Sequence, residues 1–300
     1  MTALESMARP KPAGGNVAVL VGLIGHGIGA SRTPYMHETE GRRLGLDYTY
    51  RRIDLAELPG DTHLADLLAD LLNRAEAEGF RGLNITHPAK QAVIPLLHEL
   101  SPEAEAIGAV NTVVFRQGRR LGYNTDCWGF AESFRRSLTQ ARRERVLLLG
   151  AGGAGLAVAR ALLDLGVPQI SVFDTEPARA AALAERFGAA RIEPVSDAET
   201  ALHRADGVVN ATPIGMASYP GSPIPLGWLK PRHWVADIIY FPAETALLQA
   251  ARGLGCTVLP GAGMAIFQAV KAFELFSGIA PDADAMTRHF LAAGKALGTE

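Results

Sequence analysis

Short polar side chains occur where the predicted strands of the N-terminal half end. Residues 84–90 place Thr86 at the end of a strand and Lys90 in the first turn of the next helix. The helix macrodipole disfavours a lysine at that end, so a purely solvated surface charge is poorly located there. Asn111 lies beside a strand, and Asp126 follows a predicted hairpin. Taken singly, Asn111 is typical of a turn and Asp126 of a helix N-cap. As a set, they are groups that bind hydroxyls and transfer protons.

A glycine-rich turn follows the apolar run of residues 146–149. Gly150, Gly152 and Gly155 fit the pattern G-x-G-x-x-G, in which backbone N–H groups and a helix N-terminus meet a pyrophosphate. A helix follows to residue 165, and a second strand ends on Asp174, where a carboxylate can bind the ribose hydroxyls. The context favours a dinucleotide site over a strand–turn–helix without a ligand.

Composition excludes several classes of protein. The chain has 300 residues, more than one ordinary domain needs, and a net charge of −2, which gives no electrostatic footprint for nucleic acid or an anionic membrane. The apolar run at residues 17–24 is too short to span a bilayer, and residues 1–15 are predicted to be a disordered tail rather than a signal peptide. Cys127 and Cys256 lack metal-ligand spacing, so no metal site is predicted. We expect a cytoplasmic protein.

The elements needed to position these residues follow from hydrophobic periodicity. In the first half, strands are predicted at 17–24, 47–55, 82–86, 110–115 and 119–124, and helices at 34–44 (with Thr33 as N-cap), 61–78, 89–100, 103–107 and 127–138. In the second half, strands are predicted at 146–149, 169–173, 191–195, 207–212, 234–240 and 256–259, and helices at 153–165, 177–187, 197–204, 245–254, 264–276 and 283–293.

This order predicts a two-domain α/β protein. Alternating strands and helices after the glycine turn indicate a doubly wound, mostly parallel sheet of the Rossmann type. The predicted domains are residues 1–125, which carry the polar strand ends, and residues 126–258, which bind the dinucleotide. Residues 259–300 are predicted to be helices that return to the first domain, because they have no strands left to cover.

The motifs together resemble those of the shikimate dehydrogenase family. They occur in the family's order and cover residues 17–278: Ser31-Arg-Thr-Pro34 with His37, Asn84-Ile-Thr-His-Pro-Ala-Lys90, Gly108-Ala-Val-Asn-Thr112, Asn124-Thr-Asp126, Gly150-Ala-Gly-Gly-Ala154, Asn210-Ala-Thr212 and Gly261 to Gln268. The resemblance implies two α/β domains, with the substrate domain first.

The resemblance also implies roles for individual residues. Lys90 and Asp126 match the family's proton-transferring pair, with Lys90 accepting the hydroxyl proton during oxidation and Asp126 orienting the lysine. A free lysine is protonated near neutrality, so this base role requires a lowered pKa or an alkaline pH. The implied substrate-binding residues are Ser31, Thr33, Thr86, Asn111, Tyr240 and Gln268. The implied cofactor-binding residues are Gly150, Ala151, Gly152, Gly153, Ala154, Asp174, Arg179, Thr212, Ile238 and Gly261.

The end of the second Rossmann strand favours NAD over NADP. Family members that use NADP typically carry Asn-Arg-Thr there, whereas this chain has Asp174, which would accept from both ribose hydroxyls and repel a 2′-phosphate. Arg179 is the one residue of this segment that argues against a preference for NAD, because its guanidinium could reach a 2′-phosphate. The same side chain could instead stack on adenine.

Two departures from the usual family pattern bear on the substrate. Thr33 replaces the second serine of Ser-x-Ser-Pro, and His87 replaces an apolar residue, although His87 is equally well explained by a backbone hydrogen bond. Both features resemble the branch that oxidises quinate as well as shikimate. The predicted function is therefore an NAD-dependent quinate/shikimate dehydrogenase, a monomer or homodimer with no nucleic-acid or membrane partner.

Three alternatives remain. A dehydrogenase for an aminated analogue, such as aminoquinate or aminoshikimate, would differ in one or two pocket contacts. A non-catalytic dinucleotide-binding sensor would not need to keep Lys90 and Asp126. A dehydrogenase of folate-linked one-carbon units could share the two-domain layout, but the residue 31–34 loop suits a small polyhydroxy acid better than a pteridine.

Overall fold

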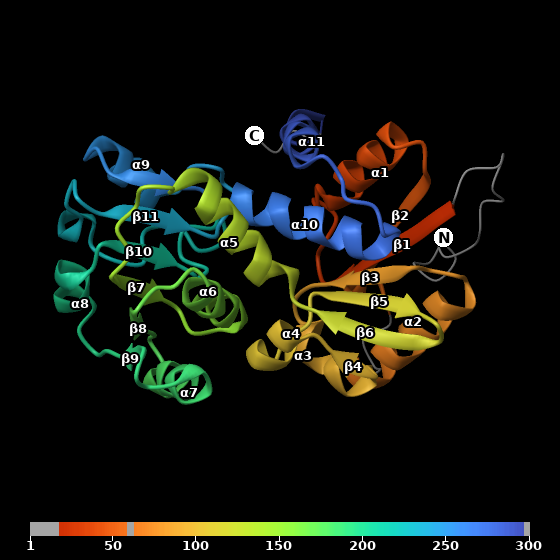
Figure 1. Ribbon diagram of the computed structural model, residues 1–300, viewed down its shortest axis with the longest axis horizontal. Coiled ribbons are helices and arrows are strands. Elements are labelled where there is room, and N and C mark those ends of the chain that lie inside the picture. The colour runs from red at the N-terminus through yellow and green to blue at the C-terminus, as the bar shows by residue number, and fades with distance from the viewer. Residues whose placement is uncertain (1–17, 59–62, 297–300) are drawn as a thin grey trace. The chain divides into compact units, whose positions relative to one another are not determined.

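The computed structural model describes residues 18–58 and 63–296, and these form two compact units (Figure 1). The first unit ends at Thr125 and resumes at Ala269, and the second runs from Asp126 to Gln268. The chain therefore returns to the first unit inside helix α10 (Ala262–Ser277) rather than at residue 259. The predicted tail, Val17 and the predicted helix start at Asp61 lie outside the described residues. Two α/β units confirm the predicted fold class.

The first unit is built on a mixed sheet. Its strands are β1 (Ala18–Gly25), β2 (Asp47–Asp54), β3 (Gly82–Ile85), β4 (Glu99–Leu100), β5 (Thr112–Arg116) and β6 (Arg119–Tyr123), in the order β2-β1-β3-β5-β6-β4. The strands β2, β1 and β3 are parallel, so their carboxyl ends meet at one edge. The predicted hairpin is confirmed, since β5 and β6 are antiparallel and joined by Gln117 and Gly118, both with positive φ.

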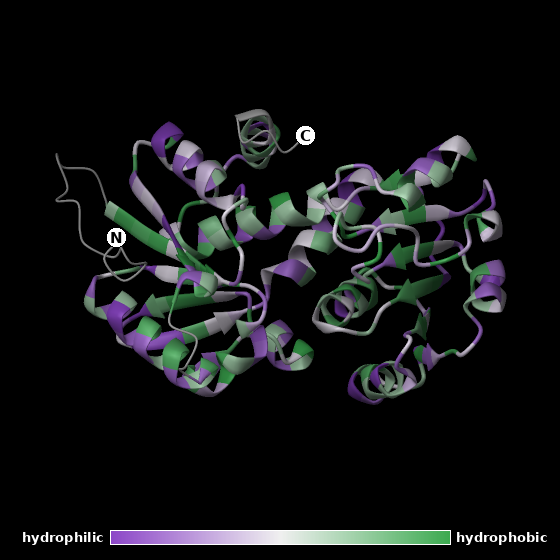
Figure 2. Cartoon of the chain, turned by 180° about the vertical axis from the view of Figure 1, so that it is seen from behind, coloured by the Kyte–Doolittle hydropathy of each residue, from purple (hydrophilic) through white to green (hydrophobic). Residues whose placement is uncertain are grey.

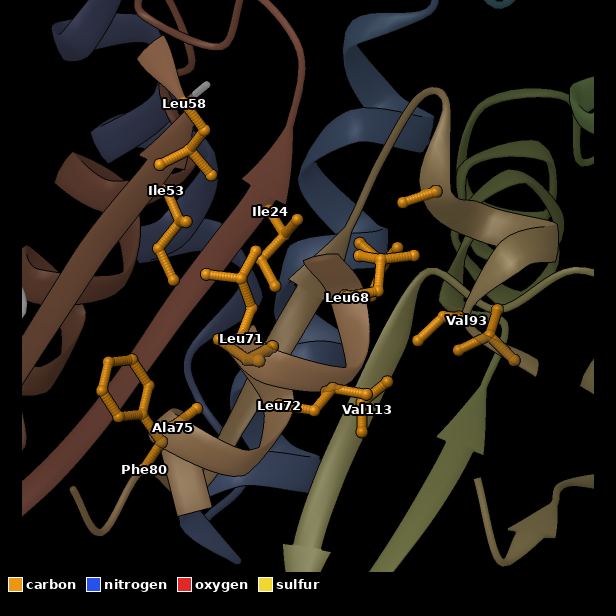
Figure 3. Close-up of a cluster of buried hydrophobic side chains, with 14 of the residues drawn as sticks. Ile24, Ile53, Leu58, Leu68, Leu71, Leu72, Ala75, Phe80, Val93 and Val113 are labelled. Carbon is orange, nitrogen blue, oxygen red and sulfur yellow. The ribbon is translucent and has the colours of Figure 1, made fainter. Parts of the chain in front are cut away.

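An apolar face of helix α2 covers this sheet. The helices of the first 125 residues are α1 (Thr33–Arg43), α2 (Leu64–Ala77), α3 (Ala89–Ala92) and α4 (Pro102–Ile107). Leu68, Leu71 and Leu72 of α2 recur at helical spacing and are fully buried. They pack with Ile24 and Val113 of the sheet, among others (Figure 3).

The helix predicted at residues 89–100 is wrong beyond Ala92. Helix α3 ends there, a 3₁₀ turn covers Ile94–Leu96, and β4 follows. Pro95 cannot donate the N–H that a continuing helix needs. In addition, β4 pairs with β6, and the N–H of His98 donates to the Arg120 carbonyl at 2.9 Å. A long-range strand pairing therefore overrides the local apolar pattern.

The second unit contains a parallel sheet wound in two directions. Its strands are β7 (Arg145–Leu149), β8 (Gln169–Phe173), β9 (Ile192–Pro194), β10 (Gly207–Asn210), β11 (Trp234–Asp237) and β12 (Thr257–Leu259), in the order β12-β11-β10-β7-β8-β9. The strand order reverses between β7 and β10, and at such a switch point loops diverge and leave room for a ligand. The glycine turn lies at the carboxyl end of β7, at this point.

The strands β10 and β11 are shorter than predicted for a common reason. Each ends on a polar residue whose side chain accepts the backbone N–H two residues further along, Thr212 for Asn210 and Ile239 for Asp237, at 3.0 Å in both cases. Such side-chain turns redirect the chain out of the extended conformation. The apolar residues that continue the pattern after Asp237 therefore belong to a loop.

Helices cover both faces of the parallel sheet. They are α5 (Thr125–Ser137), α6 (Gly153–Asp164), α7 (Pro177–Phe187), α8 (Ala198–Arg204) and α9 (Ala246–Gly253). Leu202 of α8 and Leu247 and Leu248 of α9 join one buried cluster with Leu147 and Val208 of the sheet. Figure 2 shows that the strands of the parallel sheet are largely hydrophobic, whereas the helices mix hydrophobic and hydrophilic residues.

The C-terminal helix α11 (Ala283–Ala296) packs on α1 in the first unit (Figure 1). The fully buried carboxylate of Glu40 accepts two hydrogen bonds from Arg43, at 2.7 and 2.8 Å, and one from the N–H of Asp282, at 2.9 Å. Asp282 directly precedes α11 and accepts from the N–H groups of Asp284 and Ala285. The predicted return of the C-terminal helices to the first unit is thereby confirmed.

His37 of α1 is completely buried among aromatic rings. Its Nδ1 lies 2.9 Å from the Tyr48 hydroxyl, and the ring contacts Tyr48, Tyr50, Phe273 and Phe276. Burial lowers the pKa of His37 to about 3, although the nearby Ala269 carbonyl opposes this shift. Burial also raises the pKa of Tyr48 well above its usual value, so the contact between Nδ1 and the hydroxyl joins two neutral groups.

This histidine is expected to make the first unit less stable in acid. Between pH 6.5 and about 3 the unfolded chain binds a proton at His37 and the folded chain does not, so the stability contribution falls as the pH falls through this window. Between pH 7 and pH 4.5 we expect a loss of about 2 to 3 kcal/mol in the free energy of unfolding. Urea unfolding at both pH values measures it. A His37→Gln variant should lose most of this pH dependence, and the exposed His98→Gln is the control; an unchanged slope in His37→Gln would contradict the assignment.

Candidate active site

The loop after β1 is held by the end of β2. Both oxygens of the Asp54 carboxylate accept backbone hydrogen bonds from this loop, from Gly27 at 2.7 Å and from Ile28 at 2.8 Å. Burial alone would raise the pKa of Asp54, but the N–H groups of Ala56, Gly27 and Ile28 outweigh it and lower the pKa. Sequence reasoning missed Asp54; the available signal was a carboxylate at the end of a strand beside a glycine-rich loop.

Ser31 and Thr33 follow this loop at the start of α1. The prediction that Thr33 is the N-cap of this helix is wrong, because Thr33 is the first helical residue. Arg32 occupies the N-cap position, and its side chain makes no capping hydrogen bond. Proline is also tolerated at the second position of the first turn, so the helix begins at Thr33, one residue before Pro34. Instead, the Ser31 hydroxyl lies 3.4 Å from the Thr33 N–H. The two residues whose hydroxyls are predicted to meet a carboxylate therefore lie in one turn.

Thr86 and Lys90 flank the short segment between β3 and α3. The N–H of Thr86 donates to the Ile24 carbonyl at 2.9 Å, and the Thr86 carbonyl accepts from Ala89 at 2.9 Å. The side chain of Thr86 requires a glycine at position 25, where a Cβ would lie 2.2 Å from its methyl group. Lys90 is fixed through its carbonyl, which accepts from Val110 at 2.8 Å. Because α3 has a single turn, the macrodipole argument made for Lys90 from a longer helix does not hold.

Asn111 connects the sheet to the residue before Asp126. Its Oδ1 accepts from the N–H of Thr125 at 2.7 Å, and its Nδ2 donates to the Thr125 hydroxyl at 3.0 Å. Both residues are buried. Asn111 therefore fixes the point where α5 begins, and its predicted contact with substrate stays a prediction. Asp126 lies in the first turn of α5, so the N-cap interpretation of this residue is wrong.

The glycine turn has no room for side chains at two of its glycines. A Cβ on Gly155 would lie 2.1 Å from the Gly150 carbonyl oxygen, and Gly150 has a φ of +92°. Gly152 precedes α6, and no side chain caps the helix. The turn at Gly150 therefore packs directly against the first turn of α6. In this arrangement the N–H groups at the start of α6 can bind an anion such as a pyrophosphate. These residues fit the predicted dinucleotide.

Asp174 lies beside this turn. Its Oδ2 accepts from the N–H of Ala151 at 2.7 Å, and its Oδ1 accepts from the N–H of Glu176 at 2.8 Å. The carboxylate at the end of β8 therefore holds the middle of the glycine turn in place. Arg179 forms an exposed ion pair with Glu176, with 2.7 Å between Nη2 and Oε1.

A buried polar network lies at the ends of β10 and β11. Asp237 accepts from the Asn210 amide at 3.1 Å and from the Thr245 hydroxyl at 2.7 Å, and burial raises the pKa of Asp237. Asn210 in turn accepts from the hydroxyl of Thr212 at 2.7 Å. Sequence reasoning missed Asp237 and Thr245; the signal was a carboxylate inside an apolar run. The network orients Thr212, one of the predicted cofactor contacts.

The remaining predicted residues also lie in the second unit. Gly261 leaves space for the backbone of the loop that follows β11, because a Cβ at position 261 would lie 2.4 Å from the Ile238 carbonyl oxygen. Tyr240 is 44% exposed, and the Gln268 amide donates to the Ala265 carbonyl at 3.0 Å. The first unit thus holds Ser31, Thr33, Thr86, Lys90 and Asn111, and the second holds Asp126, Tyr240, Gln268 and the predicted cofactor contacts.

None of the helices in residues 18–58 and 63–296 has the length and hydropathy that a membrane-spanning segment needs. The same residues contain no group of three or more histidine, cysteine or acidic side chains arranged to hold a metal ion.

The second unit has a doubly wound sheet with a glycine turn at its switch point. The first unit carries hydroxyl, amide and ammonium groups at its strand ends. Together these features define a dinucleotide-dependent dehydrogenase. Three family models match it. They are the shikimate dehydrogenase substrate binding domain over residues 23–113, shikimate/quinate 5-dehydrogenase over 132–215, and the shikimate 5′-dehydrogenase C-terminal domain over 261–289.

Individual relatives agree with these models. The shikimate dehydrogenase (NADP⁺) of Streptomyces avermitilis is 54% identical over 88% of this chain and 91% of its own. The quinate/shikimate dehydrogenase (NAD⁺) of Corynebacterium efficiens is 48% identical over 91% of this chain and 98% of its own. The solved structure of quinate dehydrogenase from Corynebacterium glutamicum in complex with NAD is 46% identical, with a TM-score of 0.87, over 92% of this chain and 100% of that one. The chain belongs to the shikimate dehydrogenase family, whose members are oxidoreductases acting on CH–OH groups.

Proposed function

We propose that this chain is an NAD-dependent quinate/shikimate dehydrogenase. It interconverts quinate with 3-dehydroquinate and shikimate with 3-dehydroshikimate. In this proposal the first unit binds the polyhydroxy acid and the second binds the dinucleotide. Relatives of similar identity are named for either cofactor and for one or both substrates, so the chain's own residues must support the choice.

The observation that carries the cofactor choice is the position of Asp174. Its two backbone hydrogen bonds occupy one lone pair on each oxygen, because a carboxylate offers about four acceptor sites. Each oxygen therefore keeps the capacity to accept one ribose hydroxyl. A 2′-phosphate in the same place would be repelled by the negative charge of Asp174. The carboxylate also has no hydrogen-bond donor to offer to the phosphate oxygens.

The Glu176–Arg179 ion pair supports the same choice. Arg179 is the cation on this loop that could compensate a 2′-phosphate, and the ion pair holds its guanidinium on Glu176. A phosphate would have to compete with this carboxylate and would also meet its negative charge. Exposed ion pairs are weak, so Glu176 reduces rather than abolishes the availability of Arg179.

The proposed chemistry assigns proton transfer to Lys90. A dinucleotide bound at the glycine turn would supply the hydride acceptor for the carbinol carbon. Lys90 accepts the proton of the reacting hydroxyl, and Asp126 orients the lysine and a neighbouring hydroxyl. Ser31, Thr33 and Tyr240 offer hydroxyl donors to the carboxylate, and Thr86, Asn111 and Gln268 are assigned to the ring hydroxyls.

Steady-state kinetics with quinate and shikimate, each with NAD and NADP, tests the proposal. We expect activity with both acids and at least about a tenfold higher kcat/KM with NAD, equivalent to about 1.4 kcal/mol. Asp174→Asn should lower kcat/KM with NAD and raise it with NADP, and Glu176→Gln should raise it with NADP by releasing Arg179. Glu185→Gln, an exposed charge change on α7, is the control. A wild-type preference for NADP would contradict the cofactor assignment, and inactivity with all four pairs would favour an aminated substrate or a sensor.

A further inference from the structure

Arg32 lies between the two hydroxyl residues Ser31 and Thr33, yet its side chain packs on the C-terminal helix. Its guanidinium carbon lies 5.0 Å from the ring centroid of Phe290, in a cation–π contact. Phe290 is buried, so the contact is partly shielded from water. An arginine in this turn is therefore fastened to α11, more than 250 residues further along the chain.

Gly294 completes the seat of this guanidinium. It is buried one helical turn beyond Phe290, on the same face of α11. A Cβ at position 294 would lie 2.7 Å from Nη1 of Arg32 and 2.8 Å from its central carbon. The guanidinium therefore occupies the space that any side chain at this position would fill.

The other end of α11 is fixed to the same helix α1. The buried Glu40 of α1 accepts from the N–H of Asp282, the residue that directly precedes α11. Helix α11 thus contacts α1 near both of its ends, and it cannot shift along α1 without breaking one of these contacts. Phe290 and Gly294 lie just beyond residue 289, where the match to the family model ends.

We infer that Arg32, seated between Phe290 and Gly294, is a positioning residue that sets the Ser31 and Thr33 hydroxyls for the substrate carboxylate. This inference rests on the proposed function. Arg32 acts through its two neighbours, because a displaced guanidinium would rotate the turn in which both hydroxyls lie. Small displacements of such donors weaken binding and orientation of the substrate.

The inference predicts a selective loss of acid binding. Arg32→Ala, Phe290→Leu and Gly294→Val should each raise KM for the acid by about fivefold to twentyfold, with little change in KM for the dinucleotide. Arg32→Lys, which keeps a cation over the ring, should recover part of the loss. Arg42→Ala, an exposed charge removal on the same helix, is the control and should leave KM unchanged.

The set of variants separates positioning from charge and from folding. Phe290→Leu and Gly294→Val retain the charge of Arg32, so a rise in KM confined to Arg32→Ala would overturn the inference in favour of electrostatic attraction. Equal changes in KM for acid and dinucleotide, or a loss of activity that follows thermal stability alone, would also overturn it. The Ser31→Ala variant tests the proposed function separately. If it leaves KM for the acid unchanged, the assignment of Ser31 to the substrate carboxylate fails. If Ser31→Ala raises this KM and the Arg32, Phe290 and Gly294 variants do not, the role of Arg32 fails.

Discussion

Replacement of Lys90 by alanine is expected to lower kcat by about two to four orders of magnitude, the usual contribution of a positioned acid–base group. Dinucleotide affinity should stay within about twofold, because Lys90 belongs to the first unit and the glycine turn to the second. Single-turnover kinetics and calorimetric titration with NAD measure the two effects.

The Lys90→Arg variant separates charge from proton transfer. Arginine keeps the positive charge but stays protonated throughout the accessible pH range, so it should rescue little of the lost kcat. Lys271→Ala removes a lysine of the first unit that pairs with Glu274 on α10 and is the control. Turnover close to that of the wild type in Lys90→Ala would remove Lys90 from the mechanism.

Gly155→Ala is expected to weaken dinucleotide binding by more than about tenfold and to lower the melting temperature by several degrees. The added methyl group would lie 2.1 Å from the Gly150 carbonyl oxygen, so either the turn opens or α6 moves away from it. Both movements displace the N–H groups that are proposed to meet the pyrophosphate.

The matched control for this variant is Gly253→Ala, at the end of α9. A Cβ at that glycine meets nothing within 4 Å, so the substitution changes glycine to alanine in a helix without a clash. NAD affinity and thermal unfolding should both separate the two variants. Equal NAD affinity in them would show that the close approach at Gly155 does not shape the binding turn.

The features that were predictable from the sequence are those encoded by neighbouring residues. The glycine turn, the strand before it, the helix after it and Asp174 all follow from local spacing, and the structure places the turn at a switch point of the sheet. The hairpin at Gln117 and Gly118 is local in the same sense.

The features that the sequence did not reveal depend on distant partners. Strand β4 takes the place of the last predicted helical residues because it pairs with β6, and Asp54 binds backbone N–H groups 26 and 27 residues earlier in the chain. Asp237 stands out in the sequence as a carboxylate inside an apolar run, but its partners Asn210 and Thr245 are 27 and 8 residues away. Arg32 looked like an ordinary residue of a motif, since the helix that seats it lies at the other end of the chain.

Asp174 also constrains how cofactor preference can change by mutation. The carboxylate proposed to select NAD is the same group that accepts the N–H of Ala151 in the glycine turn. A substitution that removes the acceptor leaves this backbone donor unsatisfied and loosens the turn for either cofactor. Asparagine removes the charge and keeps one oxygen that can accept the N–H of Ala151, although the N–H of Glu176 loses its acceptor. A mutational route toward NADP therefore passes more easily through asparagine than through alanine or arginine. A substitution at position 174 therefore changes the cofactor preference and the conformation of the glycine turn at the same time.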